Sequence, residues 1–149
     1  MRTNYGDEQS KRIFTLQLEK KGYKVWDADA DLDNQYKFRP DLYAEKDGVQ
    51  WAFELKARLI PSTKYGDILI SAQKVDLYAD HPEVQYRLVF FYTDGVGYMI
   101  EPSQPHTISM MPAKKTTFFE DQTLIMKPQA IYQTSTANRF TFNPKIIYG

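Results

Sequence analysis

The amino-acid sequence predicts an α/β domain, and three observations lead to this fold class. The chain has 149 residues, a length that suits one domain with a single core. Hydrophobic residues make up 42% and aromatic residues 15%, which is enough to build that core and too much for a disordered chain. Segments with helical and strand patterns follow one another in the order α-β-β-β-α-β-β up to residue 102.

The composition excludes several other classes of protein. The absence of cysteine rules out a disulfide scaffold and a thiolate zinc site. The formal net charge is zero, so a nucleic-acid partner would need a local basic patch. The first residues lack the apolar core of a signal peptide, and no apolar run is long enough to span a membrane. We therefore expect a soluble, intracellular protein of the cytoplasm.

The first predicted elements are a helix and a short strand. Residues 7–22 carry an apolar side typical of a helix, with Asp7 as the expected N-cap and Gly22 as the expected end. Residues 23–28 read as a strand, and the polar, acidic stretch that follows reads as a loop.

A β-hairpin is predicted next, from strands at 41–45 and 50–57 joined by a turn that contains Gly48. In the second strand, side chains alternate between the two faces of the sheet. The apolar set that includes Phe53 should therefore face the core, while Glu54 and Lys56 share the opposite face.

The rest of the chain divides into a predicted core and a predicted extension. Ser71 is the expected N-cap of a helix at 72–79, and residues 86–92 form an apolar strand buried on both faces. A turn and a further strand complete a core of residues 1–102. Residues 103–149 carry five Lys or Arg against two Asp or Glu and show no helical period, so short strands or extended arms are expected there. We expect this extension to pack on the core within a single domain.

The hairpin carries the residues with the clearest chemistry. If its strands pair around the Gly48 turn, Asp41 and Glu54 can converge at one end of the sheet. Two carboxylates suit Mg²⁺, which keeps several waters of its own. Lys56 would lie on the same face, where an ammonium stabilises charge on a phosphate or orients a water molecule. The alternative is that these are ordinary solvent-facing residues of a hairpin.

These residues resemble the motif of the PD-(D/E)xK nuclease superfamily. Pro40-Asp41 and Glu54-Leu55-Lys56 match the motif, and the helix that begins SAQKVDLY resembles the one that follows it in Holliday-junction resolvases and virus-type replication-repair nucleases. Gln73 matches a glutamine often found there. The resemblance covers about the first 100 residues and implies a restriction-endonuclease-like fold, a mixed central sheet flanked by helices. Residues 103–149 would add a β-rich C-terminal extension that matches no family.

The resemblance also implies a function. It implies a Mg²⁺-dependent (or Mn²⁺-dependent) nuclease that hydrolyses phosphodiester bonds in DNA, with branched or otherwise structured DNA as a candidate substrate. Asp41 and Glu54 would hold the metal, Lys56 would act on water or phosphate, and Gln73 would orient the site. Glu8 would be a further metal ligand from the first helix, with Glu19 as the alternative. Because resolvases act as dimers, a homodimer is also expected.

Contacts with nucleic acid are expected from basic residues near this site and in the extension: Arg39, Arg58, Lys64, Lys74, Lys114 and Lys115. Tyr36, Phe38 and Tyr65 lie among them in polar loops, where they either stack on bases or anchor their own loops. Two other functions stay open. The chain is alternatively a catalytically silent nucleic-acid-binding or assembly subunit of the same fold, or an enzyme that cuts RNA.

Overall fold

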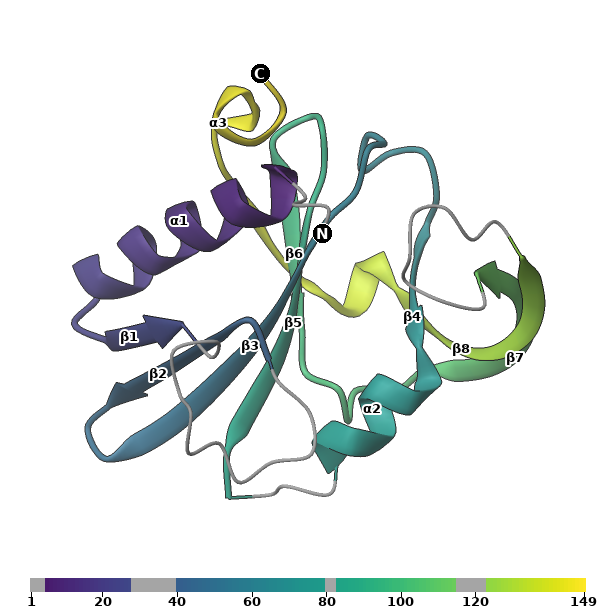
Figure 1. Ribbon diagram of the computed structural model, residues 1–149, viewed down its shortest axis with the longest axis horizontal. Coiled ribbons are helices and arrows are strands. Elements are labelled where there is room, and N and C mark those ends of the chain that lie inside the picture. Colours follow the sequence, from purple (N-terminus) through teal and green to yellow (C-terminus); the bar gives the residue numbers. More distant parts are fainter. Residues whose placement is uncertain (1–4, 28–39, 80–82, 115–122) are drawn as a thin grey trace.

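The computed structural model describes residues 5–27, 40–79, 83–114 and 123–149, and these form two sheets with helices around them (Figure 1). The main sheet has the strand order β1-β2-β3-β5-β6-β9, and the second sheet has the order β4-β8-β7. In the main sheet β3 and β5 pair in parallel, and the other neighbouring pairs are antiparallel. The mixed α/β architecture predicted from the sequence is therefore confirmed.

The main sheet contains the predicted hairpin and the buried strand beside it. Its strands are β1 (Lys24–Asp27), β2 (Leu42–Lys46), β3 (Val49–Ala57), β5 (Gln85–Phe91), β6 (Val96–Ile100) and β9 (Asn138–Thr141). The turn between β2 and β3 has positive φ angles of 53° at Asp47 and 80° at Gly48. Two such residues are what a two-residue hairpin turn requires, so the turn fixes the register of the strands.

One face of the main sheet is covered by α1 (Tyr5–Lys20) and α3 (Pro144–Tyr148). Phe14 of α1 packs edge-on against Phe53, with ring centroids 4.9 Å apart, and Leu55 and Ile147 are buried in the same cluster. The apolar face of β3 is therefore the one predicted. Asp7 lies inside α1, so the prediction that it caps the helix is wrong; the helix already includes Tyr5.

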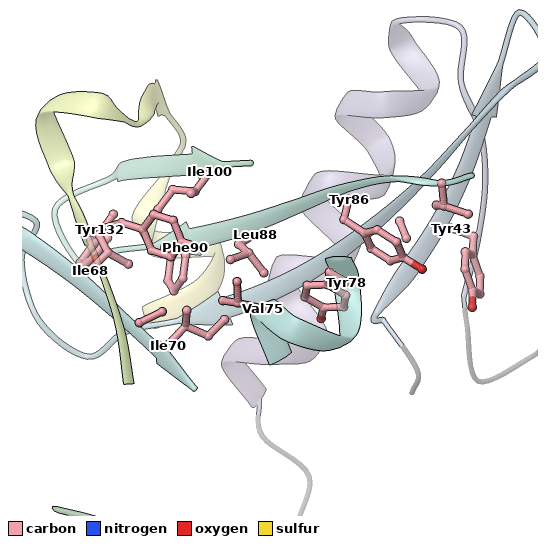
Figure 2. Packing of buried hydrophobic residues seen from close by; sticks show 14 residues of the cluster. Tyr43, Ile68, Ile70, Val75, Tyr78, Tyr86, Leu88, Phe90, Ile100 and Tyr132 are labelled. Atoms are coloured by element: carbon pink, nitrogen blue, oxygen red, sulfur yellow. The ribbon is translucent and has the colours of Figure 1, made fainter. Parts of the chain in front are cut away.

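The opposite face is covered by α2 (Ala72–Ala79) and the second sheet. The second sheet consists of β4 (Asp67–Ser71), β7 (Thr107–Lys114) and β8 (Leu124–Gln133), with a 3₁₀ turn at Thr134–Thr136. Figure 2 shows Tyr78 of α2 beneath Tyr86 of β5, and Ile68 beside Tyr132 and Phe90. The central strands β3 and β5 are thus covered on both sides, as the apolar run in β5 predicted.

Residues after 102 contribute to both sheets. β8 pairs with β4, and β9 pairs with β6 at the edge of the main sheet. The hydroxyl oxygen of Tyr148 in α3 lies 2.9 Å from the backbone oxygen of Arg58 and 2.6 Å from that of Phe91, and its one proton is shared between these acceptors. The expectation of extended structure here is wrong for residues 144–148, which are helical. Five residues are too few to show a helical period, but Asn143 as N-cap and Pro144 at the first position mark the start.

Candidate metal and nucleic-acid site

The hairpin register places Asp41 directly beside the middle of β3. Leu42 pairs with Phe53, so Asp41 lies just beyond the last pair of the ladder. Its backbone N–H donates to the oxygen of Phe53 at 2.9 Å, and its Oδ2 accepts a hydrogen bond from the N–H of Leu55 at 2.7 Å. The carboxylate is therefore fixed to the same stretch of β3 that carries Glu54.

Burial and a neighbouring acid perturb the pKa of Asp41. Burial, followed by the negative charge of Glu54, raises this pKa from 3.8 to about 6. The hydrogen bond from Leu55 and the positive charges of Lys56 and Lys11 oppose the rise. Asp41 is therefore an acid whose charged form is destabilised in the folded protein, and a bound cation would relieve that destabilisation.

Glu54 lies on the face of β3 that α2 covers, and its side chain is only 4% exposed. The alternative of an ordinary solvent-facing glutamate is therefore excluded by its burial. Its Oε1 accepts a hydrogen bond from Nζ of Lys74 at 2.7 Å and lies 3.4 Å from Nζ of Lys56. Its Oε2 accepts a hydrogen bond from the hydroxyl of Tyr78 at 3.0 Å. Charged and hydroxyl donors together compensate for the burial of this carboxylate.

Tyr78 is a neutral donor in this arrangement. Burial and the neighbouring Glu54 raise the pKa of Tyr78 well above its usual range, so the phenol keeps its proton. Its ring also stacks on Tyr86, with centroids 4.7 Å apart and planes 18° from parallel. The ring contact and the hydrogen bond hold Tyr78 in one position relative to Glu54.

Sequence reasoning did not find the contacts that Lys74 and Tyr78 make with Glu54. Lys74 was expected at nucleic acid and Tyr78 was not singled out, yet each holds one oxygen of the carboxylate. The signal was available in their spacing, because residues four apart lie on the same side of a helix. Gln73, the residue expected to orient the site, is exposed in the first turn of α2.

The described residues offer two protein carboxylates for a metal ion and not three. Across residues 5–27, 40–79, 83–114 and 123–149, no group of three Asp, Glu, His or Cys side chains could hold an ion. Glu8 and Glu19, the two candidates from the first helix, are both exposed on α1 and join no such group. Two hard oxygen donors still fit Mg²⁺, which binds through one or two carboxylates and retains several waters.

The predicted nucleic-acid contacts lie in different places. Arg58, directly after β3, donates to the oxygen of Leu69 at 2.9 Å, and its guanidinium carbon lies 5.4 Å from the ring centroid of Phe90. Nζ of Lys64 lies 5.6 Å from the ring centroid of Tyr65. Lys114 is the last residue of β7. Arg39, Lys115, Tyr36 and Phe38 lie outside the described residues.

Comparison with known proteins extends the assignment of the fold. No family model matches the chain, and no curated protein matches it. The arrangement of the mixed sheet and its flanking helices is similar to the fold of a solved structure.

A solved structure with this similarity is Hjc, a Holliday junction resolvase from the archaeal hyperthermophile Archaeoglobus fulgidus. The two structures align with a TM-score of 0.52 over 84% of this chain and 86% of that chain, at 14% sequence identity. The likeness establishes a shared fold.

In the described part of the chain, no helix has the length and apolar character needed to cross a membrane.

Proposed function

We propose that this chain is a divalent-metal-dependent nuclease of the PD-(D/E)xK type that hydrolyses phosphodiester bonds in DNA. One observation carries the proposal: the half-buried Asp41 and the buried Glu54 lie side by side, with lysines around them. Burying two acids together is costly, and an acid with a raised pKa, such as Asp41, is typical of functional sites. The fold shared with a Holliday junction resolvase supports the same reading.

In this proposal Asp41 and Glu54 hold Mg²⁺ or Mn²⁺. Such an ion, when bound, neutralises charge on the phosphate and lowers the pKa of a bound water. Oδ2 of Asp41 accepts a hydrogen bond from the N–H of Leu55, which fixes the carboxylate. Tyr78 fixes the rotation of the Glu54 carboxylate through Oε2. These two contacts supply the preorganisation that a metal site needs from its surroundings.

The two lysines act on charge rather than on the ion. Lys56 lies 3.4 Å from Glu54 and its side chain is 36% exposed, so its ammonium can contact both the carboxylate and a phosphate at the surface. In that position it stabilises negative charge that develops on the phosphate oxygens. Lys74 forms an ion pair with Glu54 at 2.7 Å. Gln73 keeps its proposed role of orienting the site. Glu8 joins no group of three acids among the described residues, so Asp41 and Glu54 hold the ion in this proposal.

The position of Lys74 also favours a second candidate function. Its ammonium hydrogen-bonds to Oε1, one of the oxygens that a metal would use. A carboxylate neutralised by lysines needs no metal, which is the arrangement expected of a catalytically silent nucleic-acid-binding or assembly subunit. The two functions differ in whether an ion displaces Lys74 from Glu54.

Cleavage assays test the proposal directly. Wild-type protein should cut at least one of branched, linear duplex and single-stranded DNA when Mg²⁺ or Mn²⁺ is added, and none without it. An RNA panel run beside it tests the alternative of an RNA-cutting enzyme. Glu54→Gln should lower cleavage on the order of 10³-fold or more, because the amide keeps the shape and removes the charge that binds the metal.

Glu45→Gln is the matched control, since Glu45 is exposed on β2 and away from the site. Undiminished cleavage by a folded Glu54→Gln protein would disprove the site. Mn²⁺ titration by calorimetry separates the two candidate functions, because only the nuclease should lose ion binding in Asp41→Asn and Glu54→Gln. We further propose a homodimer acting on DNA inside the cell, which sedimentation of the full chain would test.

A further inference from the structure

A cavity of about 370 Å³ adjoins the candidate site through Lys56 and Lys74, which contact Glu54, and its lining is rich in positive charge. Lys56, Arg58 and Lys74 line it, and none of the described residues in its lining is acidic. In a chain of zero net charge, three cations around one cavity are a local concentration of positive charge. Two of them already contact Glu54, so the charge extends from the candidate metal site outward. A cavity with this lining suits a phosphate backbone.

The opposite wall of this cavity comes from the second sheet. Met111, Pro112 and Ala113 of β7 form that wall, together with residues at the end of β4. These side chains carry no charge, and a proline has no backbone N–H to donate. The cavity is therefore positive where Lys56, Arg58 and Lys74 line it, and largely apolar along β7.

A second cavity of about 430 Å³ continues from the first. The two share Arg58, Leu69 and Met111, so they are adjacent, and Arg58 borders both; we call the pair of cavities the groove. Tyr65 and Tyr92 line the second cavity among aliphatic side chains, and Tyr65 is 55% exposed. Arg58 is held at the junction by its hydrogen bond to Leu69 and its contact with the Phe90 ring.

The second cavity differs from the first in charge. Among the described residues that line it, Asp67 is the one acidic side chain. Its carboxylate would repel a phosphate, whereas it can accept a hydrogen bond from the amino group of a base. Aromatic and aliphatic walls favour the flat face of a base. The groove thus has a cationic part for the backbone and an apolar, aromatic part for a base.

We propose that this groove binds an unpaired nucleotide next to the phosphodiester that is cut, with the base against Tyr65 and the backbone on Arg58, Lys56 and Lys74. This inference rests on the proposed nuclease function and names its substrate class: DNA with a single-stranded segment at the cleavage point. A base inside a continuous duplex is stacked and paired and does not reach such a cavity. Single strands, flaps and unpaired branch points present one.

Fluorescence anisotropy tests the groove without depending on cleavage. Glu54→Gln protein is titrated, with no divalent metal, into a labelled single strand and into a blunt duplex of the same sequence. Adding Tyr65→Ala should weaken binding of the single strand about tenfold to 100-fold, the range expected for one stacked base, and should leave duplex binding unchanged. Tyr65→Phe keeps the ring and should restore single-strand binding.

Leu59→Ala is the matched control, because Leu59 is 84% exposed and lines neither cavity. Circular dichroism verifies the fold of each variant. Three results would overturn the groove: a single strand bound equally well by Tyr65→Ala, equal losses for single strand and duplex, or no single-strand binding by any variant. Failure of the nuclease function appears elsewhere, as a wild-type protein that binds through Tyr65 and cuts no DNA with either ion.

Discussion

The two faces of the main sheet differ in how completely apolar side chains cover them. The face under α1 and α3 is closed by apolar side chains such as Phe14, Phe53 and Ile147. The face under α2 and the second sheet has its own apolar cluster, but it also holds Glu54 at 4% exposure and opens into the groove. One face is therefore optimised for burial, while the other gives up part of its apolar cover to hold charges. We expect changes on the first face to alter stability and changes on the second to alter activity.

Among the variants that test this difference between the two faces, Phe53→Ala should have the largest effect. It removes a ring that contacts Phe14 and Trp51 in the α1-side cluster, so the free energy of unfolding should fall by about 3–5 kcal/mol. Urea titration followed by circular dichroism measures this loss. Activity per folded molecule should be retained at low temperature. A variant that stays as stable as wild type would show that the closed face does not carry the stability.

Lys56→Ala tests the other face. Turnover should fall about 10²-fold to 10³-fold, because the ammonium acts on water or phosphate, while Mn²⁺ binding should persist. Stability should change little, since the side chain is 36% exposed. Kinetics and calorimetry on the same preparation measure the two properties. Loss of metal binding together with turnover would give Lys56 a role in the metal site itself.

Asp41→Asn should exchange activity for stability. The folded-state pKa of about 6 lies above the unfolded value of 3.8, so Asp41 favours folding below pH 3.8, and that contribution is lost as the pH rises through 6. At pH 7 the charged side chain therefore costs up to about 3 kcal/mol, which asparagine removes while its oxygen still accepts from Leu55.

The gain of Asp41→Asn over wild type should be larger at pH 7 than at pH 4, as measured by urea titration at both values. Added Mg²⁺ should stabilise wild type and leave this variant unchanged, because only the charged acid binds the ion. A gain independent of pH would mean that Asp41 is not the titrating group.

The smallest effect is expected from two basic residues after 102, Lys114 and Lys115. Lys114→Ala with Lys115→Ala should weaken DNA binding uniformly across sequences and lower the salt slope by about one unit for each phosphate that is no longer neutralised. Binding at several salt concentrations measures this slope, and cleavage should remain. An unchanged slope would mean that this pair serves solubility or packing between subunits. The proposed division into a core of 1–102 and an extension of 103–149 would then not be supported by a role of the extension in DNA binding.

Much of this arrangement could be predicted from the sequence because local patterns encode it. The hairpin was found from its glycine turn and its alternation, and Asp41 beside Glu54 followed from the register. The burial of Glu54 could not be predicted, because the cover comes from α2 and a second sheet whose strands β4 and β8 lie 53 residues apart at Ser71 and Leu124. Lys74 and Tyr78 were missed as partners of Glu54 for the same reason. The two residues are close to each other in the sequence, but Glu54 lies on a different element, and the sequence does not show that α2 packs over it.

The hydrogen bonds of Tyr148 have a consequence for the order in which the molecule assembles. Its hydroxyl reaches the backbone of Arg58, 90 residues earlier, and α3 packs on α1. β9 closes the edge of the sheet just before it. Contacts between such distant parts of a chain form slowly, because the entropy of closing a long loop is lost before the contacts can stabilise the structure. The α1-side core is therefore expected to form late in folding. A chain still being synthesised would contain Asp41 and Glu54 well before α3 and β9 could pack around the sheet that positions them.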